Sequence, residues 1–350
     1  MNSHSLDHTT FDALVVREVE HNFTRQVETR TVSDLPTGEV LLRVRYSSLN
    51  YKDALSASGN RGVTRHYPHT PGVDAVGEVA ASDDPAFQVG DWVITGGYDL
   101  GMNTAGGFGQ YIRVPAKWLL PLPRGIDPFS TMVLGTAGFT AGLSLHKLEE
   151  AGLRPELGEV LVTGATGGVG SVAVALLAKA GYRVVASTGK TEQAPLLQQL
   201  GAAETIGRDA LQAGADKALL KQRWAAVVET VGGQILANAI KSTAANGWIT
   251  TCGNVASAEL PITVYPFILR GVNLLGVDAA NATLDVRRKV FAKLLTTWRV
   301  ELPTSLVTKI TLPELPAQID RTLQGQQVGR VVVDLWPHGT DALPTPRPAE

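Results

Sequence analysis

A glycine-rich turn stands between an apolar strand-like segment and an apolar helix-like one. Val160–Val162 lead into Thr163–Gly170, and the mostly apolar residues 171–180 follow. This order is typical of a dinucleotide-binding site, because glycines let the backbone approach a pyrophosphate and the free N–H groups at a helix start attract its charge. Gly170 would let the helix pack on the strand. We therefore expect NAD or NADP here, with contacts from Thr166, Gly167, Gly168 and Val169.

The surroundings of this turn strengthen the prediction. Ala165 stands where the G-x-G-x-x-G pattern has its first glycine, and Gly164 lies one place earlier, so the glycines alone are weak support. A second strand-like segment, 181–187, follows at the distance that a strand–helix–strand unit requires. The alternative is a glycine-rich turn in another kind of α/β protein, and this spacing disfavours it.

The end of that second segment indicates which cofactor is preferred. An NAD site usually has Asp or Glu there for the ribose 2′-hydroxyl, whereas this chain has Ser187-Thr188-Gly189-Lys190. Lys190 and Arg208, which follows the next expected strand, offer cations to a 2′-phosphate. Each could instead be an ordinary solvated charge. The combination favours NADP, with Thr188, Gly189, Lys190 and Arg208 as contacts.

Composition limits the classes of function. The 350 residues carry 31 Lys and Arg against 33 Asp and Glu, so no strong field favours nucleic acid or a membrane surface. The single cysteine, Cys252, excludes an intramolecular disulfide and a multi-cysteine metal site. Residues 1–10 are polar, and no apolar run reaches about eighteen residues. We expect a cytoplasmic protein that acts on small molecules.

The pattern of elements changes along the chain. From Phe11 to Pro123, short strand-like runs are separated by Gly, Pro and Asp, which predicts a mainly β region. From Pro128, helix-like and strand-like segments alternate, before β-like segments return after a helix expected over Leu284–Trp298. We expect an α/β protein: a doubly wound Rossmann cofactor domain (131–280) inserted into a β-rich domain (1–130 and 281–336), with the active site in the cleft between them. Residues 337–350 are expected to be disordered.

Five motifs in order resemble those of one family. They occupy residues 47–53 (Ser-Ser-Leu-Asn-Tyr-Lys-Asp), 71–79, 89–93, 135–141 and 163–170. Through them the chain resembles the medium-chain dehydrogenases/reductases over nearly all of residues 11–336. It is most similar to the zinc-independent quinone-oxidoreductase branch and, through residues 50–55, 266–272 and 276–278, to the acryloyl-CoA reductase (AcuI/YhdH) group. The resemblance implies that the β-rich catalytic domain is GroES-like.

The chain lacks the residues that hold zinc in the family's alcohol dehydrogenases. Those enzymes have a Cys early in the β-rich domain and a His-Glu pair after a turn that here reads Pro71-Gly72-Val73-Asp74, and no cysteine precedes Cys252. His66 and His69 lie near this turn, but without a thiolate or a third ligand we interpret them as loop histidines. We predict no metal.

Without zinc, reduction of an activated alkene is better provided for than alcohol–ketone chemistry, because it needs a hydride, polarisation of the acyl oxygen and a proton. Tyr51 resembles the family residue beside the nicotinamide, so it is a candidate for contact with cofactor and substrate, and its hydroxyl could donate a proton or a hydrogen bond. Asn50 could orient either partner, while Lys52 and Asp53 could pair or tune Tyr51. The alternative is that Tyr51 only anchors a loop.

Further residues follow from the resemblance. Asn254 and Ile268 resemble positions that line the nicotinamide pocket, so we expect them to contact the cofactor. Cys252 is expected to act as a small buried hydrophobe. The phosphates of a CoA thioester need cations, for which four arginines are candidates. These are Arg61, Arg65, Arg270 and Arg287.

The sequence therefore predicts an NADPH-dependent reductase of an activated alkene, and the resemblance implies reduction of acryloyl-CoA to propanoyl-CoA. Two alternatives stay open: an NADPH quinone reductase, and an NADPH-binding protein with little catalytic activity. The family also implies a homodimer in which the strand Asn273–Val277 of two copies pairs. No nucleic acid or membrane partner is expected.

Overall fold

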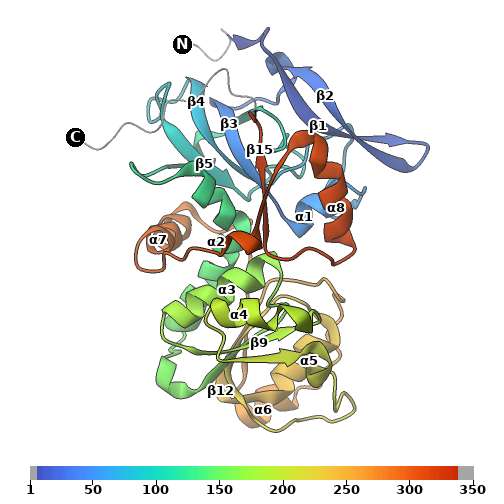
Figure 1. Ribbon diagram of the computed structural model, residues 1–350, viewed down its shortest axis with the longest axis vertical. Coiled ribbons are helices and arrows are strands. Elements are labelled where there is room, and N and C mark those ends of the chain that lie inside the picture. Colours follow the sequence, from blue (N-terminus) through green and yellow to red (C-terminus); the bar gives the residue numbers. More distant parts are fainter. Residues whose placement is uncertain (1–5, 338–350) are drawn as a thin grey trace. The chain divides into compact units, whose positions relative to one another are not determined.

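A computed structural model describes residues 6–337, and its backbone divides into two units (Figure 1). Unit 1 comprises the described residues up to Thr136, Ala280–Leu284, and the described residues from Pro303 onward. Unit 2 comprises Ala137–Ala279 and Asp285–Leu302. The sequence pattern placed all of 281–336 in the β-rich domain, whereas 285–302 group with unit 2. Of the tail expected to be disordered, residues 338–350 lie outside the described part.

Unit 1 is built mainly on antiparallel strands, with one parallel pair between Val307–Thr311 and Arg330–Asp334. A separate hairpin joins β1 (Thr10–Val19) and β2 (Asn22–Thr31). The main sheet has the order β14-β15-β3-β4-β5-β7, with β6 also paired to β3. Its strands are β3 (Val40–Leu49), β4 (Asp74–Ser82), β5 (Trp92–Gly96), β6 (Tyr111–Val114), β7 (Leu119–Pro121), β14 (Val307–Thr311) and β15 (Arg330–Asp334).

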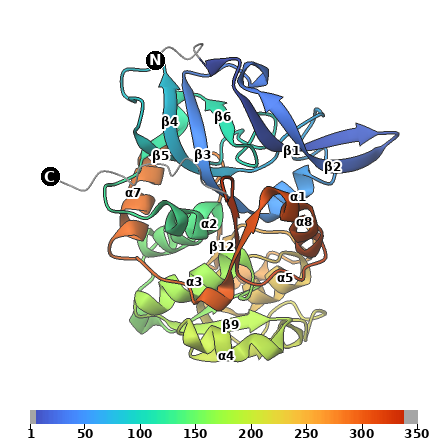
Figure 2. The ribbon, with the colours of Figure 1, turned by 45° about the horizontal axis from the view of Figure 1, so that its top comes forward.

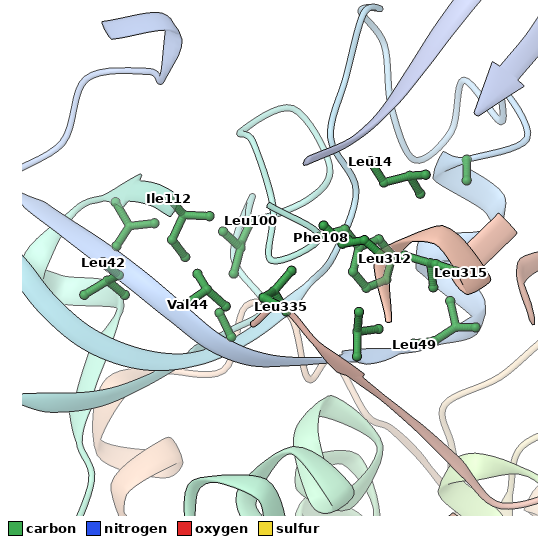
Figure 3. Packing of buried hydrophobic residues seen from close by; sticks show 14 of the residues in the cluster. Leu14, Leu42, Val44, Leu49, Leu100, Phe108, Ile112, Leu312, Leu315 and Leu335 are labelled. Carbon is green, nitrogen blue, oxygen red and sulfur yellow. The ribbon is translucent and has the colours of Figure 1, made fainter. Parts of the chain in front are cut away.

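One apolar cluster holds unit 1 together. Figure 3 shows side chains from distant segments gathered in one cluster, with Leu42 of β3 near Ile112 at one end and Phe108 near Leu312 and Leu315 toward the other. Phe108 is fully buried. Since truncating such a phenylalanine to alanine typically costs about 3–5 kcal/mol, this cluster fixes the strands that carry the polar groups described below.

Two helices of unit 1 were not expected from the sequence. The segment α1 (Tyr51–Ser56) is a helix of only six residues, too short to show a periodic pattern. The second is α8 (Leu315–Leu323), whose Leu315 and Ile319 are buried four residues apart, as in an amphipathic helix. Figures 1 and 2 show α8 beside α1.

Unit 2 contains one parallel sheet. Its strand order is β10-β9-β8-β11-β12-β13. The strands are β8 (Glu159–Val162), β9 (Arg183–Thr188), β10 (Glu204–Gly207), β11 (Trp224–Glu229), β12 (Thr243–Thr251) and β13 (Asn273–Gly276). The connecting helices are α3 (Gly168–Lys179), α4 (Ala194–Gln199), α5 (Gly233–Ser242) and α6 (Tyr265–Arg270).

The strand order reverses between β8 and β11. Because right-handed crossovers leading away from this point in opposite directions lie on opposite faces, α3 and α4 cover one face of the sheet and α5 and α6 the other. This is the doubly wound Rossmann arrangement, so the predicted fold class is confirmed. The reversal places ligand-binding loops at the carboxyl ends of β8 and β11.

Two longer helices complete the structure. The helix α2 (Pro128–Glu150) is interrupted at Gly135, where φ is 50° and ψ is −150°, and the division between the units falls within it, after Thr136. The helix α7 (Leu284–Leu295) packs in unit 2, where Phe291 stacks on Phe139 of α2. Among residues 6–337, no helix is long and apolar enough to cross a membrane.

Candidate active site and nucleotide-binding turn

The helix α1 starts on a pair of residues that bind each other. The backbone N–H of Asn50, which precedes the helix, donates to Asp53 Oδ2 at 2.8 Å. The other oxygen of Asp53 accepts from the N–H of Val73 at 2.8 Å. Asp53 is fully buried, so it ties the first turn of α1 to the segment that leads into β4. An acidic residue three positions after the helix cap is the usual arrangement for this contact.

A second buried carboxylate, Asp74, accepts hydrogen bonds from three residues. Its Oδ2 accepts from Ser48 Oγ at 2.5 Å and from Asn50 Nδ2 at 2.7 Å. Thr136 adds its hydroxyl to Oδ1 at 2.5 Å and its backbone N–H at 2.9 Å. Such charge-assisted hydrogen bonds compensate for the loss of water around the carboxylate.

Arg330, at the start of β15, lies on the other side of these groups and is only 2 % exposed. Its Nη2 donates to Ser48 Oγ at 2.9 Å, and its Nη1 donates to Asn50 Oδ1 at 3.3 Å. Its Nε donates to the carbonyl of Val133 at 2.9 Å. The guanidinium therefore reaches Asp74 through a hydroxyl and an amide.

The group made of Ser48, Asn50, Asp53, Asp74, Thr136 and Arg330 is called the buried polar network below. It packs against the break in α2, because a Cβ added to Gly135 would lie 2.5 Å from Ser48 Oγ and 2.7 Å from Asp74 Oδ2. Only a residue without a side chain fits there, and its positive φ has the same requirement.

The network contains two carboxyl groups and one guanidinium. Burial, and then the nearby charge of Asp74, raises the pKa of Asp53 to about 7. Burial also lowers the pKa of Arg330, against the opposing charges of Asp74 and Asp53. Asp53 therefore titrates near neutral pH, beside the residue proposed for contact with substrate.

Tyr51 and Lys52 differ from their neighbours. Both are half-buried, and neither side chain makes a hydrogen bond or an ion pair with any residue in the described range 6–337. Lys52 does not pair with Asp53, contrary to one of the alternatives drawn from the sequence. The two side chains that are available for other partners thus stand between Asn50 and Asp53, whose polar groups are engaged.

The glycine-rich turn of unit 2 has the predicted close packing. A Cβ added to Gly170 would lie 2.2 Å from the carbonyl oxygen of Gly164, so α3 can approach the turn only because residue 170 is glycine. The N–H of Ala165 donates to the carbonyl of Ser187 on β9 at 2.9 Å. The hydroxyls of Thr166 and Thr188 lie 3.0 Å apart. The turn and the end of β9 are thereby held together.

The two predicted cations lie beside one another at the ends of β9 and β10. The guanidinium of Arg208 lies over Gly189, since a Cβ added there would be 2.9 Å from Arg208 Cζ. Burial is the main cause that lowers the pKa of Lys190; Glu192 opposes this and the charge of Arg208 adds to it. Thr188, Gly189, Lys190 and Arg208 are therefore brought together, as an anionic ligand would need.

Asn254 and Ile268, expected to contact the cofactor, lie on other segments. Asn254 is exposed in the loop after β12, and a Cβ added to Gly232 would meet its Cα at 3.0 Å. Ile268 lies on α6 and is 68 % exposed. No contact described within residues 6–337 joins Ile268 to the turn 163–170, so its expected role stays a prediction.

Glu229, a buried acid that the sequence analysis did not single out, lies at the carboxyl end of β11 and binds the residues that follow the central strands. Glu229 Oε1 accepts from the backbone N–H groups of Val231 and Gly232, both at 2.8 Å, and from Thr163 Oγ1 at 3.2 Å. Burial raises its pKa against these hydrogen bonds. The thiol of Cys252 donates to the Glu229 carbonyl at 3.4 Å, and burial, with a smaller contribution from Glu229, raises the pKa of that thiol to about 12.

Three of the four arginines proposed for CoA phosphates have other partners, two of them within unit 2. Arg270 donates to the carbonyls of Lys241 and Leu220, both at 2.7 Å. Arg287 is buried, donates to the Ala279 carbonyl at 2.7 Å and lies over the ring of Phe139. Both hold unit 2 together. The other two lie on the exposed loop after α1, where Arg61 pairs with Glu18 at 2.5 Å and Arg65 has no side-chain partner among the described residues.

In the described part of the chain, no group of three or more His, Cys, Asp or Glu side chains is placed to hold a metal ion. His69 is buried, and its Nε2 lies 2.9 Å from the carbonyl oxygen of Gly101. His66 is exposed. These two histidines near the turn at Gly72 therefore have different surroundings.

Comparison with known proteins agrees with this architecture. Residues 36–124 match the family described as alcohol dehydrogenase GroES-like domain, and residues 168–296 match the family described as zinc-binding dehydrogenase. The chain is 42% identical to the acrylyl-CoA reductase AcuI of Ruegeria pomeroyi, over 93% of this chain and 99% of that protein.

Two solved structures are similar over almost their whole length. YhfP of Bacillus subtilis, whose name assigns it provisionally to the quinone oxidoreductases and whose structure has NAD bound, is 44% identical, with a TM-score of 0.90 over 93% of this chain and 100% of that one. YhdH of Salmonella enterica, in complex with NADP, is 41% identical, with a TM-score of 0.88 over 92% and 99% of the two chains. The chain therefore belongs to the medium-chain dehydrogenase/reductase family, in the branch that contains YhfP and the acrylyl-CoA reductases.

Proposed function

We propose that this protein reduces an activated alkene with NADPH, and that its substrate is acryloyl-CoA, which it converts to propanoyl-CoA. The observation that carries the cofactor assignment is that Lys190 and the guanidinium of Arg208 lie close together next to Gly189, at the end of a strand that has no acidic residue there. A 2′-phosphate is the group that such paired cations would bind. The substrate assignment is supported by the identity with AcuI over most of the chain.

The residues of the turn fit a dinucleotide. Gly167 at the cap and Gly168 at the first position of α3 leave the backbone N–H groups there uncovered by their own side chains, so Thr166, Gly167, Gly168 and Val169 would hold the pyrophosphate. Thr188, Gly189, Lys190 and Arg208 would hold the 2′-phosphate. When bound, NADPH supplies the hydride that the β-carbon of the alkene accepts.

Tyr51 is the residue that we assign to the substrate. Its hydroxyl has no hydrogen-bond partner among residues 6–337, so it is available to donate a hydrogen bond to the acyl oxygen, where negative charge develops, or a proton to the α-carbon. Asn50 and Asp53 act indirectly, because their polar atoms hold α1 in place. The half-buried ammonium group of Lys52 adds positive charge next to Tyr51.

The test follows the absorbance of NADPH with purified protein and acryloyl-CoA, and then with NADH, crotonyl-CoA and a benzoquinone at matched concentrations. We expect the highest kcat/KM for the pair of NADPH and acryloyl-CoA. Tyr51→Phe should lower kcat, whereas Tyr265→Phe, at an exposed tyrosine of α6, should not. Equal activity of the Tyr51→Phe variant and the parent would exclude the role given to this hydroxyl.

The identity with YhfP favours a second candidate, reduction of a quinone by NADPH. A quinone has no CoA phosphates and so needs no cations for them. Of the four proposed arginines, only Arg65 has a side chain that makes no hydrogen bond or ion pair with the described residues. Higher kcat/KM with benzoquinone than with acryloyl-CoA would select this function. Tight NADPH binding with no turnover of either substrate would leave only a cofactor-binding role.

We also propose that two copies pair through β13. This strand is the last in the order of the unit 2 sheet, so its outer backbone groups have no partner strand within the described chain. Light scattering coupled to gel filtration should give twice the chain mass of 37.1 kDa. Gly276→Pro should reduce it to the monomer mass if this edge forms the interface, because the N–H of Val277 donates to Thr251 of β12 and the N–H of residue 276 therefore faces the outer edge.

A further inference from the structure

Arg330 is bound to three consecutive residues that lead into Tyr51. It donates to Ser48 Oγ at 2.9 Å, to the backbone carbonyl of Leu49 at 3.4 Å and to Asn50 Oδ1 at 3.3 Å. It comes from β15, about 280 residues further along the chain, and pairs with β3 through its own strand. One side chain thus holds the end of β3 and the start of α1 together.

These contacts also fix which way the Asn50 amide points. A guanidinium can only donate and an ionised carboxylate can only accept, so Oδ1 must face Arg330 and Nδ2 must face Asp74. The backbone N–H of Asn50 is then directed to Asp53. Side chain and backbone of the residue before Tyr51 are both held in one orientation.

We propose that Arg330 is a positioning residue for the reaction: it fixes the segment Ser48–Asn50 and thereby the place of Tyr51. This rests on the proposed function, because Tyr51 is the residue assigned there to the substrate. An arginine is needed, since its planar group presents several N–H donors at once, whereas a lysine ammonium on a flexible stem cannot satisfy Ser48, Leu49, Asn50 and Val133 together. A displacement of about 1 Å in a reacting group can lower the rate about 100-fold.

The experiment is a double-mutant cycle in the full-length protein. Arg330→Lys should lower kcat with the proposed substrate by roughly 100-fold, while the KM for NADPH stays within about twofold. If Arg330 acts through Tyr51, the variant with both Arg330→Lys and Tyr51→Phe should be about as slow as Tyr51→Phe alone. If the fall in kcat of the double variant equals the product of the falls in the two single variants, the two residues act independently and the proposal is wrong.

The control is Arg45→Lys. Arg45 lies on β3, the strand that pairs with the strand of Arg330, and forms an ion pair with Asp334. It makes no contact with the segment 48–50 within the described residues. We expect Arg45→Lys to lower stability without lowering kcat. An equal fall in kcat for both variants would show that replacing any paired arginine of unit 1 by lysine has this effect, and the proposal would be wrong.

Hydrogen exchange of the backbone amides gives a readout that does not depend on turnover. Arg330→Lys should accelerate exchange in a peptide covering residues 48–56 more than elsewhere in unit 1, and Arg45→Lys should not. Evenly spread acceleration would overturn the positioning role, whether or not acryloyl-CoA is the substrate. If Arg330→Lys is recovered unfolded, Ser48→Ala, which removes one of the contacts, takes its place in both measurements with the same expectations.

Discussion

Arg330 and Asp74 compensate each other without forming an ion pair: Ser48 Oγ accepts from the guanidinium and donates to the carboxylate, and the amide of Asn50 does the same with its two ends. Two polar side chains, those of Ser48 and Asn50, separate the two charges. The stability of each buried charge therefore depends on these two side chains as well as on the opposite charge. Removing one member leaves the others buried without their partners.

Asp74→Asn should therefore be strongly destabilising. The variant removes the larger of the two negative charges that act on the buried Arg330 guanidinium, and its amide cannot accept from Ser48, Asn50 and Thr136 together. We expect the free energy of unfolding to fall by about 3–5 kcal/mol, as for other broken buried charge pairs. Urea unfolding of both proteins measures this. A loss below about 1 kcal/mol would show that the network contributes little to stability.

Asp53 should make stability depend on pH. Its pKa is raised from 3.8 to about 7 in the folded protein, so between these values the folded state binds the proton that the unfolded state has released. Stability should then fall as pH rises from about 4 to 7, by up to roughly 1.4 kcal/mol per pH unit, and level off above. Asp53→Asn should lose this dependence, as urea unfolding at pH 5 and pH 8 would show.

Asp334 provides the matched control for that experiment. Burial raises its pKa, but hydrogen bonds from Arg45 and Lys309 more than offset this and hold the pKa below its usual value. Its contribution to stability is thus present above the unfolded pKa and is lost only at more acidic pH. Asp334→Asn should lower stability equally at pH 5 and pH 8. Parallel behaviour of the two variants would contradict the assignment to Asp53.

Gly135→Ala should be more costly than the same change at Gly125. Both glycines have positive φ, which costs an alanine about 1–2 kcal/mol. A Cβ at Gly125 meets no atom within 4 Å, whereas one at Gly135 meets Ser48, Asp74 and Arg330. We expect thermal and urea unfolding to show an extra loss of about 1–3 kcal/mol for Gly135→Ala. Equal losses would mean that the network moves aside easily.

Arg208→Ala should weaken NADPH binding by about tenfold or more and leave NADH binding nearly unchanged, because only NADPH carries the 2′-phosphate. The control is Arg223→Ala, since Arg223 is also an arginine of unit 2 but pairs with Glu159 and Glu204 at the starts of β8 and β10. The fluorescence of bound NADPH and NADH gives the dissociation constants of both variants and of the parent protein. A parallel loss for NADH and NADPH would remove Arg208 from the phosphate site.

Cys252 should react slowly with thiol reagents in the folded protein. Its thiol donates a hydrogen bond to the Glu229 carbonyl, and its pKa is raised to about 12, so little thiolate forms at neutral pH. Because the chain has a single cysteine, the reaction with a chromogenic disulfide reports on this thiol alone. We expect a rate far below that of the urea-unfolded chain. Similar rates would show that the site opens readily.

The sequence predicted unit 2 well because its signals are local. The turn at Gly164–Gly170 and the strands on either side follow one another directly, and a parallel sheet with intervening helices leaves a regular alternation in the chain. The proximity of Lys190 and Arg208 could also be predicted from the sequence, since the two residues follow neighbouring strands of that sheet. The helix expected over Leu284–Trp298 was found as α7, with its end within a few residues, for the same reason.

The buried polar network was not predicted because its members meet only in the folded chain. Ser48 and Asp74 belonged to recognised motifs, but nothing local connects them with Arg330, which begins a short apolar strand near the end of the described residues. A single arginine before three valines was the one signal that could have raised suspicion, because charges are rare in fully buried strands. Glu229, at the end of an equally buried strand, offered a similar signal.

The pairing of β15 with β3 sets an order for biosynthesis. All the strands of unit 2 lie between Glu159 and Gly276 and can associate as soon as that stretch has left the ribosome. The sheet of unit 1 is completed only when Val331 pairs with Leu49, and Arg330 reaches Asn50 in the same step. A chain released early could thus form the parallel sheet of unit 2 but would lack the contacts that Arg330 makes with Ser48, Leu49 and Asn50.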